Sequence, residues 1–551
     1  MVMHDLKQLL IQRIHSGLAR KTVTTCSRWS EMYRVMGKPF PGPWNFAHHP
    51  WLREMHDSTA VMNVGQKSAQ MGFTETVLNV SFYKIDIEGE SVLYVLPSKT
   101  GASDFSASRF DPALQASAHL RAMFNDVANV GHKRAGAANL FVRGSNSREG
   151  LKSVPAGTLV FDELEEMNQE NIPLAYERAS GQVSKLIWKI STPSIDDYGI
   201  NKYFKLTTQE HFFFPCPACG RQIELTVDNL IVTGESEDDP KLRDSHMICV
   251  QCKNRLSNDR KDKSYYLSKG LWVPTHTDRE DRGFYINQLY STTITPYDLA
   301  RSYVRSLTNA ADEQEFFNSK MGLTHVVKGA RVTDEDINAC IGDYTTMHAP
   351  HNNRLITMGV DVGKWLHYEI RSWQVGQFVG TDVNTMARCQ VLKAGKCLHF
   401  EELDILMNQY AVMMCVCDAN PERRKAFEFA QRFWSRVKLC LYGKAIGGKT
   451  ITVGKDVDGQ IVADELITVD RTSWLDMTMG RYSRRTIALP KDVSTEYREH
   501  IKAPVRVYKK DDEGNQTASY VNAKDDHFAH AANYAEIALP LAATINESHT
   551  I

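Results

Sequence analysis

A glycine-bounded loop in the first half of the chain has residue types that suit phosphate binding. The segment "GQKSAQMGFTE" (65–75) follows an apolar stretch and opens into a helical pattern. With Gly72 aligned to the second glycine of G-x-x-x-x-G-K-[ST], Thr74 takes the Mg²⁺ position and Phe73 stands where lysine belongs. Lys67, early in the loop, can replace that lysine, because phosphate requires a nearby positive charge rather than one fixed spacing.

An acidic pair further along the chain completes a pattern typical of ATP hydrolysis. The apolar segment "TLVFDELEEM" (158–167) ends its strand in Asp162, which can hold Mg²⁺, and Glu163, which can orient the attacking water. The next strand closes with "STPS" (191–194), where Thr192 can sense the γ-phosphate. We therefore predict that Glu163 is catalytic and that ATP and Mg²⁺ are bound by these residues: Gly65, Lys67, Ser68, Gly72, Thr74, Asp162 and Thr192.

A second segment, "GKAIGGKT" (443–450), matches the phosphate-loop pattern letter for letter. The stretch after it is rich in β-branched residues and broken by Gly and Asp, which favours strands and a turn rather than the required helix. We predict that this segment is a loop of a later domain and not the ATP site. Lysines that can contact DNA phosphate there and in a later hairpin are Lys444, Lys449, Lys509 and Lys510.

Carboxylates in the second half recur at the ends of predicted elements. The apolar strand "LITMGVDV" delivers Asp361, and "AVMMCVCD" delivers Asp418. A helix then begins at "KDDHFAH", with Asp525 and Asp526 in its first turn and His530 one turn on. This order is typical of RNase H-like nucleases, in which three carboxylates hold two Mg²⁺ or Mn²⁺ ions for attack on a phosphodiester.

Two close cysteine pairs lie between these halves, in "FPCPACG" and "ICVQC". Four thiolates satisfy tetrahedral Zn²⁺ and leave no open position, so we predict a structural zinc site. Its ligands are Cys216, Cys219, Cys249 and Cys252.

The elements that must position these residues fall into several domains. A chain of 551 residues is long enough for two or more cores, and its net charge of −1 shows no global basic field. Strand-like runs at 59–64, 91–97, 158–161 and 185–191, separated by helical patterns, predict an α/β sheet with crossover helices. We find no apolar run of membrane-spanning length and no signal-peptide pattern, and we expect a soluble intracellular protein.

Three segments in this order resemble the large terminase subunit of tailed phages in the lambda-like group: "VGQKSAQMGFTE", "SREGLKSVPAGTLVFDELEEM" and "STPS". In that group the phosphate-loop lysine is also displaced. The chain departs from some members at Gln70 and Glu75. The resemblance implies a RecA-like P-loop ATPase, a zinc-ribbon-like insertion and an RNase H-like nuclease. The implied division is 1–40 helical segment, 41–210 ATPase, 211–275 zinc-binding insertion, 276–350 connecting region and 351–545 nuclease.

The resemblance also implies site residues. Asp361, Asp418 and Asp526 would be the nuclease ligands and catalytic residues, with Asp525 and His530 as alternatives for the third. In "PGPWNFAHHPWLREMHD" (41–57), Trp44 or Trp51 would stack on adenine. The sequence does not identify the arginine finger. Arg143 and Arg148 are candidates because they precede the acidic strand.

The implied function is ATP-driven packaging of double-stranded viral DNA into a procapsid, with endonucleolytic cutting of concatemers. The implied partners are DNA, a small terminase subunit and the portal protein, in a homo-oligomeric ring in the host cytoplasm and with no membrane. The cofactors would be ATP, Mg²⁺ or Mn²⁺, and Zn²⁺. Alternatives are a helicase-nuclease of repair or restriction, which needs further helicase motifs not found after residue 200, and a non-enzymatic zinc-dependent DNA-binding scaffold.

Overall fold

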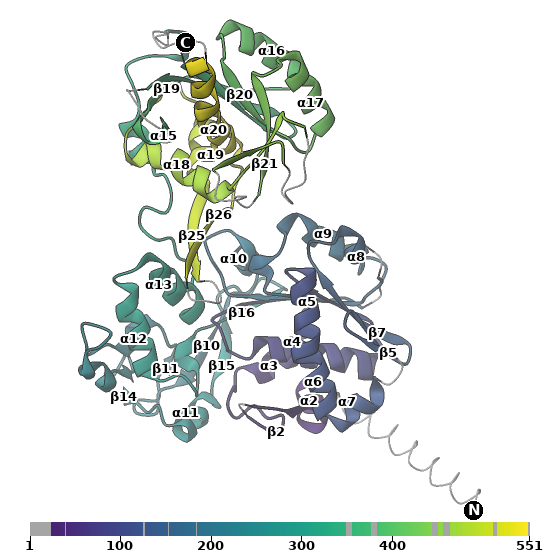
Figure 1. Ribbon diagram of the computed structural model, residues 1–551. Coiled ribbons are helices and arrows are strands. Elements are labelled where there is room, and N and C mark those ends of the chain that lie inside the picture. Colours follow the sequence, from purple (N-terminus) through teal and green to yellow (C-terminus); the bar gives the residue numbers. More distant parts are fainter. Residues whose placement is uncertain are drawn as a thin grey trace, which may run out of the picture. The chain divides into compact units, whose positions relative to one another are not determined.

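The chain divides into two compact units, residues 1–326 and 327–551 (Figure 1). This computed structural model describes residues 24–38, 40–124, 127–152, 154–182, 184–348, 355–375, 383–443, 450–455, 463–510 and 515–548. The expected connecting region, 276–350, is divided between the two units. Its strand β16 (Arg282–Ile286) belongs to the first unit, because it pairs with the first strand of the main sheet.

The first unit is built on a mainly parallel sheet. Its central strands include the four that the sequence predicts, β3 (Met62–Lys67), β4 (Val92–Leu96), β8 (Thr158–Asp162) and β9 (Leu186–Ser191). They are arranged in the order β16-β3-β9-β8-β4-β7, with β7 spanning Ala138–Gly144. The expected RecA-like α/β fold is confirmed, because β9 separates the phosphate-loop strand β3 from the acidic strand β8.

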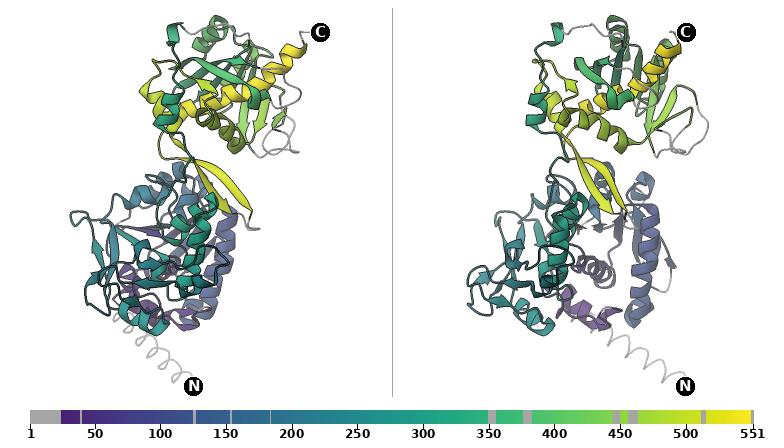
Figure 2. Two further views of the ribbon diagram at one scale, coloured as in Figure 1. Left: turned by 90° about the vertical axis from the view of Figure 1, so that its left-hand side faces the viewer. Right: turned by 60° about the vertical axis from the view of Figure 1, so that its left-hand side comes forward.

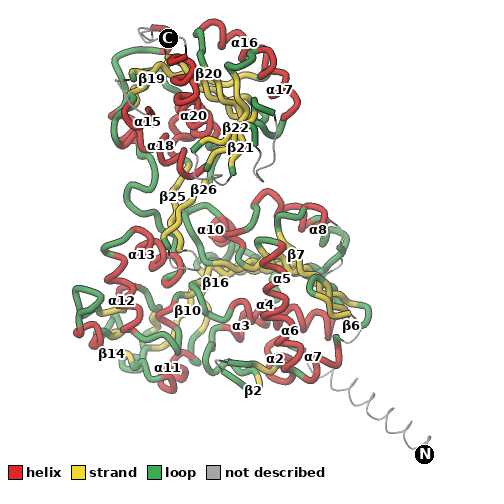
Figure 3. The backbone as a smooth tube through the Cα atoms, in the orientation of Figure 1, coloured by secondary structure: helices red, strands yellow, loops and turns green. Residues whose placement is uncertain are grey.

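Both faces of this sheet are covered by helices, as Figure 3 shows. Alternate residues of β4 enter different apolar clusters: Tyr94 packs on the side of α4 (Phe73–Tyr83), and Leu93 and Val95 on the side of α9 (Ile172–Tyr176) and α10 (Gly199–Phe204). A strand buried on both faces must be apolar throughout, and β4 is fully buried. Because these strands run parallel, their carboxyl ends lie along the same side of the sheet, and the last residue of each strand is presented there.

The cysteine-bearing insertion extends from the edge of the sheet. β10 (Glu210–Pro215) runs parallel to β16 and antiparallel to β15 (Leu271–Pro274). Beyond β10 a short hairpin is formed with β11 (Gln222–Ile223), and a separate small sheet contains β12 (Leu230–Ile231), β13 (His246–Ile248) and β14 (Arg255–Leu256). The insertion is thus joined to the ATPase-like sheet through β10, which pairs with β16.

The second unit contains a mixed sheet with the topology expected of an RNase H-like fold. β17 (Leu355–Val362), β18 (Leu366–Gln374) and β19 (Arg388–Cys397) form an antiparallel meander. β20 (Met414–Asp418) and β21 (Val437–Tyr442) then add in parallel beside β17. The helices α16 (Phe400–Gln409) and α17 (Arg423–Arg432) share one apolar cluster with the sheet.

The other face of this sheet carries α20 (His527–Ser548), the yellow helix that crosses the unit in Figure 2. Its backbone approaches β17 so closely that a Cβ on Gly359 would lie 2.0 Å from the carbonyl oxygen of Ala531. Only glycine leaves room for this approach. The contact fixes the start of α20 near Asp361, two residues further along β17.

No helix in the described part of the chain is both long and apolar enough to cross a membrane.

Candidate functional site

The loop between β3 and α4 in the first unit has a backbone suited to phosphate. Lys67 ends β3, and the 11-residue helix α4 begins directly after Gly72. Gln70 and Gly72 have positive φ angles of 63° and 84°. A Cβ at position 72 would also lie 2.6 Å from Leu52 Cδ1, so glycine is required there on two counts. The resulting turn aims the free N–H groups of the α4 N-terminus at the space in front of the loop.

Residues far along the sequence hold this loop in place. The backbone N–H of Ser68 donates to Ile286 O at 3.0 Å, and that of Ala69 donates to Ser319 O at 2.8 Å. The side chain of Gln288 donates to Ala69 O at 3.0 Å. The region after β16 is therefore part of the loop's support, which no local sequence pattern indicates.

The carboxylate of Asp162 lies directly behind the loop. It accepts hydrogen bonds from Thr74 Oγ1 at 3.4 Å and Tyr94 OH at 2.6 Å. Burial, followed by repulsion from Glu163, raises the pKa of Asp162 to about 6. Thr74 and Asp162 thus bring a hydroxyl and a carboxylate oxygen together, which is the donor type that Mg²⁺ prefers.

Glu163 stands beside Lys67, at the turn that follows β8. Its φ angle of 59° is unusual for a residue with a Cβ. Lys67 Nζ donates to Glu163 Oε1 at 3.2 Å, and Ser191 Oγ donates to Oε2 at 3.4 Å. The glutamate is part-exposed and can therefore meet a water molecule.

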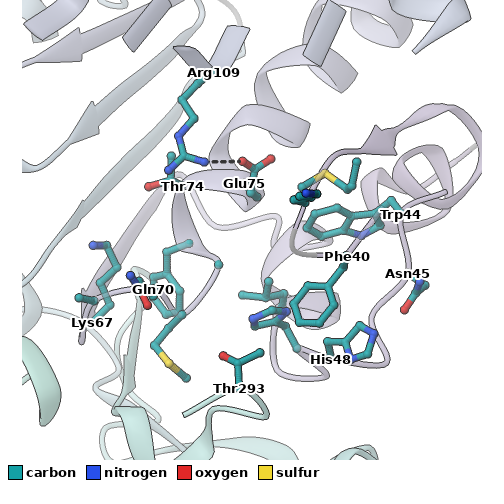
Figure 4. A pocket seen from close by; sticks show the side chains of 18 of the residues that line it. Phe40, Trp44, Asn45, His48, Lys67, Gln70, Thr74, Glu75, Arg109 and Thr293 are labelled. Carbon is teal, nitrogen blue, oxygen red and sulfur yellow. Dashed lines mark ion pairs between the residues drawn. The ribbon is translucent and has the colours of Figure 1, made fainter. Parts of the chain in front are cut away.

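A cavity of about 640 Å³ opens in front of these groups (Figure 4). Of the sequence-predicted residues, Lys67, Gly72, Thr74, Glu163 and Thr192 line it. The other three predicted contacts, Gly65, Ser68 and Asp162, do not. Gly65 lies within β3, where a Cβ would meet the Phe73 ring at 2.5 Å, and the Ser68 side chain is buried.

Aromatic residues line the opposite side of the cavity. Figure 4 shows Phe40, Trp44 and His48 across from Lys67, Gln70 and Thr74. The rings of Phe40 and His48 are stacked with centroids 3.9 Å apart. Trp51 is fully buried, donates to Met71 O at 3.1 Å and does not line the cavity. Of the two tryptophans considered for base stacking, the geometry therefore favours Trp44.

The arginine at this cavity is one that the sequence motifs did not indicate. Arg109 lines it, with Nη1 3.6 Å from Glu75 Oε1. Arg143 and Arg148, the two considered from sequence, do not line it. Arg143 instead donates to the carbonyl oxygens of Gly131 and Val142.

The four predicted zinc ligands converge in the insertion. One sulfur from each of Cys216, Cys219, Cys249 and Cys252 lies within 4.8 Å of the others. The two turns match: Gly220 N donates to Cys216 O at 2.9 Å, and Lys253 N donates to Cys249 O at 2.8 Å. Burial opposes ionisation of Cys249, but the backbone N–H groups of Cys252 and Gln251 lower its pKa to about 7. Burial raises the pKa of Cys216 to about 12, so Zn²⁺ would have to displace its proton, and the four-sulfur donor set itself fits Zn²⁺.

Two predicted nuclease carboxylates lie side by side in the second unit. Asp361 on β17 and Asp418 at the end of β20 follow residues that pair in parallel register, Val360 and Cys417. Burial, and then the nearby Asp361, raises the pKa of Asp418 to about 6, although Asn420 N donates to it at 3.0 Å. Such mutual destabilisation is relieved by a cation between the two groups.

The third predicted carboxylate, Asp526, lies just before α20 rather than in its first turn. It is buried, with Oδ2 3.3 Å from His530 Nε2 and 3.9 Å from Arg471 Nη2. Asp525, its alternative, is exposed. Among the described residues, Asp361, Asp418 and Asp526 do not form a cluster with all donor atoms within 4.8 Å, whereas Asp361, His367 and His527 do. The sequence reasoning did not consider the two histidines as ligands.

The lysines predicted to contact DNA are only partly described. Lys444 and Lys449 in the letter-perfect motif lie outside the described residues, and so does the side chain of Lys510. The flanking strands β21 and β22 (Ile451–Val453) belong to the sheet of the second unit. The segment is therefore followed by a strand, not by the helix that a phosphate loop requires.

Two family models match successive parts of the chain, and the boundary between them lies before the one between the compact units, so the endonuclease match includes β16 of the first unit. Residues 38–272 match the family model described as phage terminase large subunit gpA, ATPase domain, and residues 281–546 match terminase large subunit gpA, endonuclease domain. The large terminase subunit of Escherichia phage lambda is 21% identical over 345 residues, 56% of this chain and 53% of that protein. The chain thus spans about half the length of this curated relative.

Solved structures with some likeness include two phage terminases. The large terminase of bacteriophage HK97 has a TM-score of 0.46 at 10% identity, covering 94% of this chain and 99% of that one. The large terminase ATPase domain of a Thermus phage has a TM-score of 0.30 at 13% identity, covering 50% and 92%. From its two family matches, which leave only residues 273–280 between them, the chain belongs to the gpA family of phage terminase large subunits.

Proposed function

We propose that this chain uses ATP to translocate double-stranded viral DNA into a procapsid and cuts concatemeric DNA with a metal-dependent endonuclease. The observation that carries the proposal is the meeting of Lys67, Thr74 and Glu163 at one cavity, with Asp162 directly behind it. Its volume, about 640 Å³, is within the range of small-molecule sites. In a separate unit, Asp361 and Asp418 lie near the ends of adjacent strands, as a phosphodiester-cleaving site requires.

In the ATP site, each residue has a distinct task. The N-terminus of α4 and the Lys67 ammonium bind phosphate oxygens, and Thr74 with Asp162 would hold Mg²⁺. Glu163 orients water toward the γ-phosphate, while Thr192 and Ser191 lie next to it at the end of β9. Phe40, Trp44 and His48 offer flat apolar surfaces to the adenine ring on the opposite side. When bound, Mg²⁺ supplies positive charge to the transferring phosphoryl group.

In the nuclease site, Asp361, Asp418 and Asp526 would hold Mg²⁺ or Mn²⁺, which activates water and neutralises the phosphate. For Asp526 to hold the same metal as the other two carboxylates, its side chain must rotate away from His530 and Arg471. The four cysteines would hold a structural Zn²⁺ that fixes the insertion to β10. We further propose a small terminase subunit and a portal protein as partners, a homo-oligomeric ring as the working assembly, and the host cytoplasm as its location.

The test is a pair of assays on the full chain. DNA-stimulated ATP hydrolysis is measured by phosphate release, and cleavage by conversion of supercoiled plasmid to nicked or linear forms with Mg²⁺ or Mn²⁺. Asp418→Asn should abolish cleavage and leave ATP hydrolysis in place. Glu163→Gln should abolish ATP hydrolysis and leave cleavage in place. A chain without ATPase activity in the presence of DNA would overturn the motor, and cleavage unaffected by both Asp418→Asn and Asp361→Asn would overturn the nuclease.

A further inference from the structure

Two histidines lie beside Asp361 in the second unit, outside the predicted carboxylate set, and a third packs against those two. His367 on β18 is the direct cross-strand partner of Asp361 on β17. His527 begins α20, and its ring stacks on that of His367 with centroids 4.6 Å apart and planes within 8°. His500, on α19 (Thr495–Lys502), lies with its ring centroid 5.7 Å from each of the other two.

The donor atoms of this group are close enough for one ion. His527 Nδ1 lies 2.8 Å from Asp361 Oδ2. Asp361, His367 and His527 each offer a donor atom within 4.8 Å of the other two. Ligands that are each about 2.1 Å from an ion, and at right angles, lie about 3 Å apart. The Asp361–His527 contact is a hydrogen bond, which a bound ion would replace, and its 2.8 Å length also matches the spacing of two neighbouring ligands in an octahedral site.

His367 adds an observation that points to a ligand. Only 4% of its surface is exposed, yet its Nδ1 has no hydrogen-bond partner within the described structure. A buried polar atom without a partner is destabilising, and coordination to an ion would give this nitrogen a partner.

We propose that Asp361, His367 and His527 form a nitrogen-rich metal site, distinct from the all-carboxylate set and sharing only Asp361 with it, that selects a borderline transition-metal ion over Mg²⁺. Imidazole nitrogen suits Co²⁺, Ni²⁺ and Zn²⁺, whereas Mg²⁺ requires oxygen ligands. His500 supports the site from behind, since its Nδ1 accepts a 3.4 Å hydrogen bond from Phe528 N, the residue after His527. The binding claim holds whether or not the chain cleaves DNA, although a role in cleavage would rest on the proposed nuclease.

The experiment is a Co²⁺ titration of the full chain, purified with its cysteine cluster filled by zinc, in a large excess of Mg²⁺. Isothermal calorimetry should show one Co²⁺ per chain that Mg²⁺ does not displace, and that ion should be lost in both His367→Gln and His527→Gln. The matched control is His325→Gln, because His325 Nε2 also contacts a carboxylate, Glu313 Oε1 at 2.6 Å, but in the first unit. This control should retain the Co²⁺.

Two further measurements make the outcome decisive. His527 is part-exposed, so His527→Gln should fold even if the buried His367→Gln does not, and circular dichroism checks both. Asp418→Asn should retain the Co²⁺ while losing cleavage, which separates failure of this site from failure of the nuclease. The proposal is overturned if Mg²⁺ displaces the Co²⁺ from the wild-type chain, or if folded His527→Gln binds Co²⁺ as the wild type does.

Discussion

Lys67 Nζ and Glu163 Oε1 lie 3.2 Å apart, so the cation expected to bind phosphate is paired with the carboxylate expected to orient water. Lys67 is almost fully buried, whereas 43% of the Glu163 side chain is exposed. Lys67 cannot bind phosphate, and Glu163 cannot orient water, while the two remain bound to each other. Arrival of a nucleotide offers Lys67 a more highly charged partner, which would release Glu163 toward water. We therefore expect this pair to couple nucleotide binding to ATP hydrolysis.

Replacing the lysine tests which of two phosphate-loop patterns is used. Lys67→Ala removes a charge-assisted contact, so we expect loss of ATP hydrolysis and weaker binding of a fluorescent ATP analogue. Lys449→Ala, in the letter-perfect motif, is the control and should hydrolyse ATP near the wild-type rate. The opposite pattern, with Lys449 essential and Lys67 dispensable, would contradict the assignment.

Changing the glutamate should separate binding from chemistry. Glu163→Gln keeps the size of the side chain but cannot accept a proton or orient water as a carboxylate does. We expect hydrolysis to fall by about 100-fold or more while the ATP analogue binds at least as tightly as to the wild type. Equal losses in binding and in hydrolysis would indicate a structural role for Glu163 instead.

The elements that carry the predicted site residues could be predicted because each follows from a local pattern. The strand carrying Asp162, the strand–loop–helix around Lys67 and the paired cysteines are each defined within a short segment. Prediction from sequence failed where a residue acts from a distance: β16 and Ser319 support the phosphate loop, and Arg109 reaches the cavity with no motif around it. His367 was missed because a cross-strand partner depends on register, which the sequence of β18 alone does not reveal.

The raised pKa of Asp162 predicts a pH dependence of magnesium-assisted nucleotide binding. Burial and the neighbouring Glu163 raise this pKa to about 6, and a protonated Asp162 cannot hold Mg²⁺. The extra ATP affinity that Mg²⁺ confers should therefore be present above pH 6 and be lost as the pH falls through about 6. Binding of the fluorescent analogue, measured with Mg²⁺ and with EDTA across pH 5–8, gives that difference.

Because ATP itself also titrates, Asp162→Asn serves as the control for this pH series. Its side chain does not ionise, so the magnesium-dependent difference should be small at every pH and should lack the step near pH 6. A step of equal size in the variant would show that the nucleotide, not Asp162, is its source.

The cysteine cluster predicts about one zinc ion per chain, measured by elemental analysis of the purified protein. Cys249→Ser leaves three thiolates and removes the sulfur whose pKa is lowered to about 7, so zinc content should fall well below one. Limited proteolysis should then cut within residues 212–255, because the loops between these short strands depend on the metal. Cys26→Ser, at an isolated buried cysteine, should keep its zinc. Full zinc content in Cys249→Ser would refute the site.

A buried ion network predicts where the second unit is most sensitive to substitution. Glu536 on α20 has no exposed surface and accepts from Arg371 Nη1 at 2.7 Å and Arg481 Nε at 2.6 Å. Glu536→Ala leaves the buried Arg481 without a carboxylate partner among the described residues, while Arg371 keeps its ion pair with the buried Glu369. Removing one partner of such a group costs about 3–5 kcal/mol, because the remaining charge is not solvated.

The matched control for this substitution is Glu496→Ala, since Glu496 also pairs with a cation, Lys396 at 2.7 Å, but at the surface. An exposed pair of this kind contributes about 0–1 kcal/mol. Urea unfolding of the full chain gives the free energies, and hydrogen exchange of the α20 peptides identifies the transition that belongs to the second unit. We expect Glu536→Ala to lower the midpoint of that transition strongly and to speed exchange in α20, while Glu496→Ala changes neither. Equal, small effects from both variants would mean that apolar packing of α20 on β17, and not the ion network, holds the helix that starts at His527.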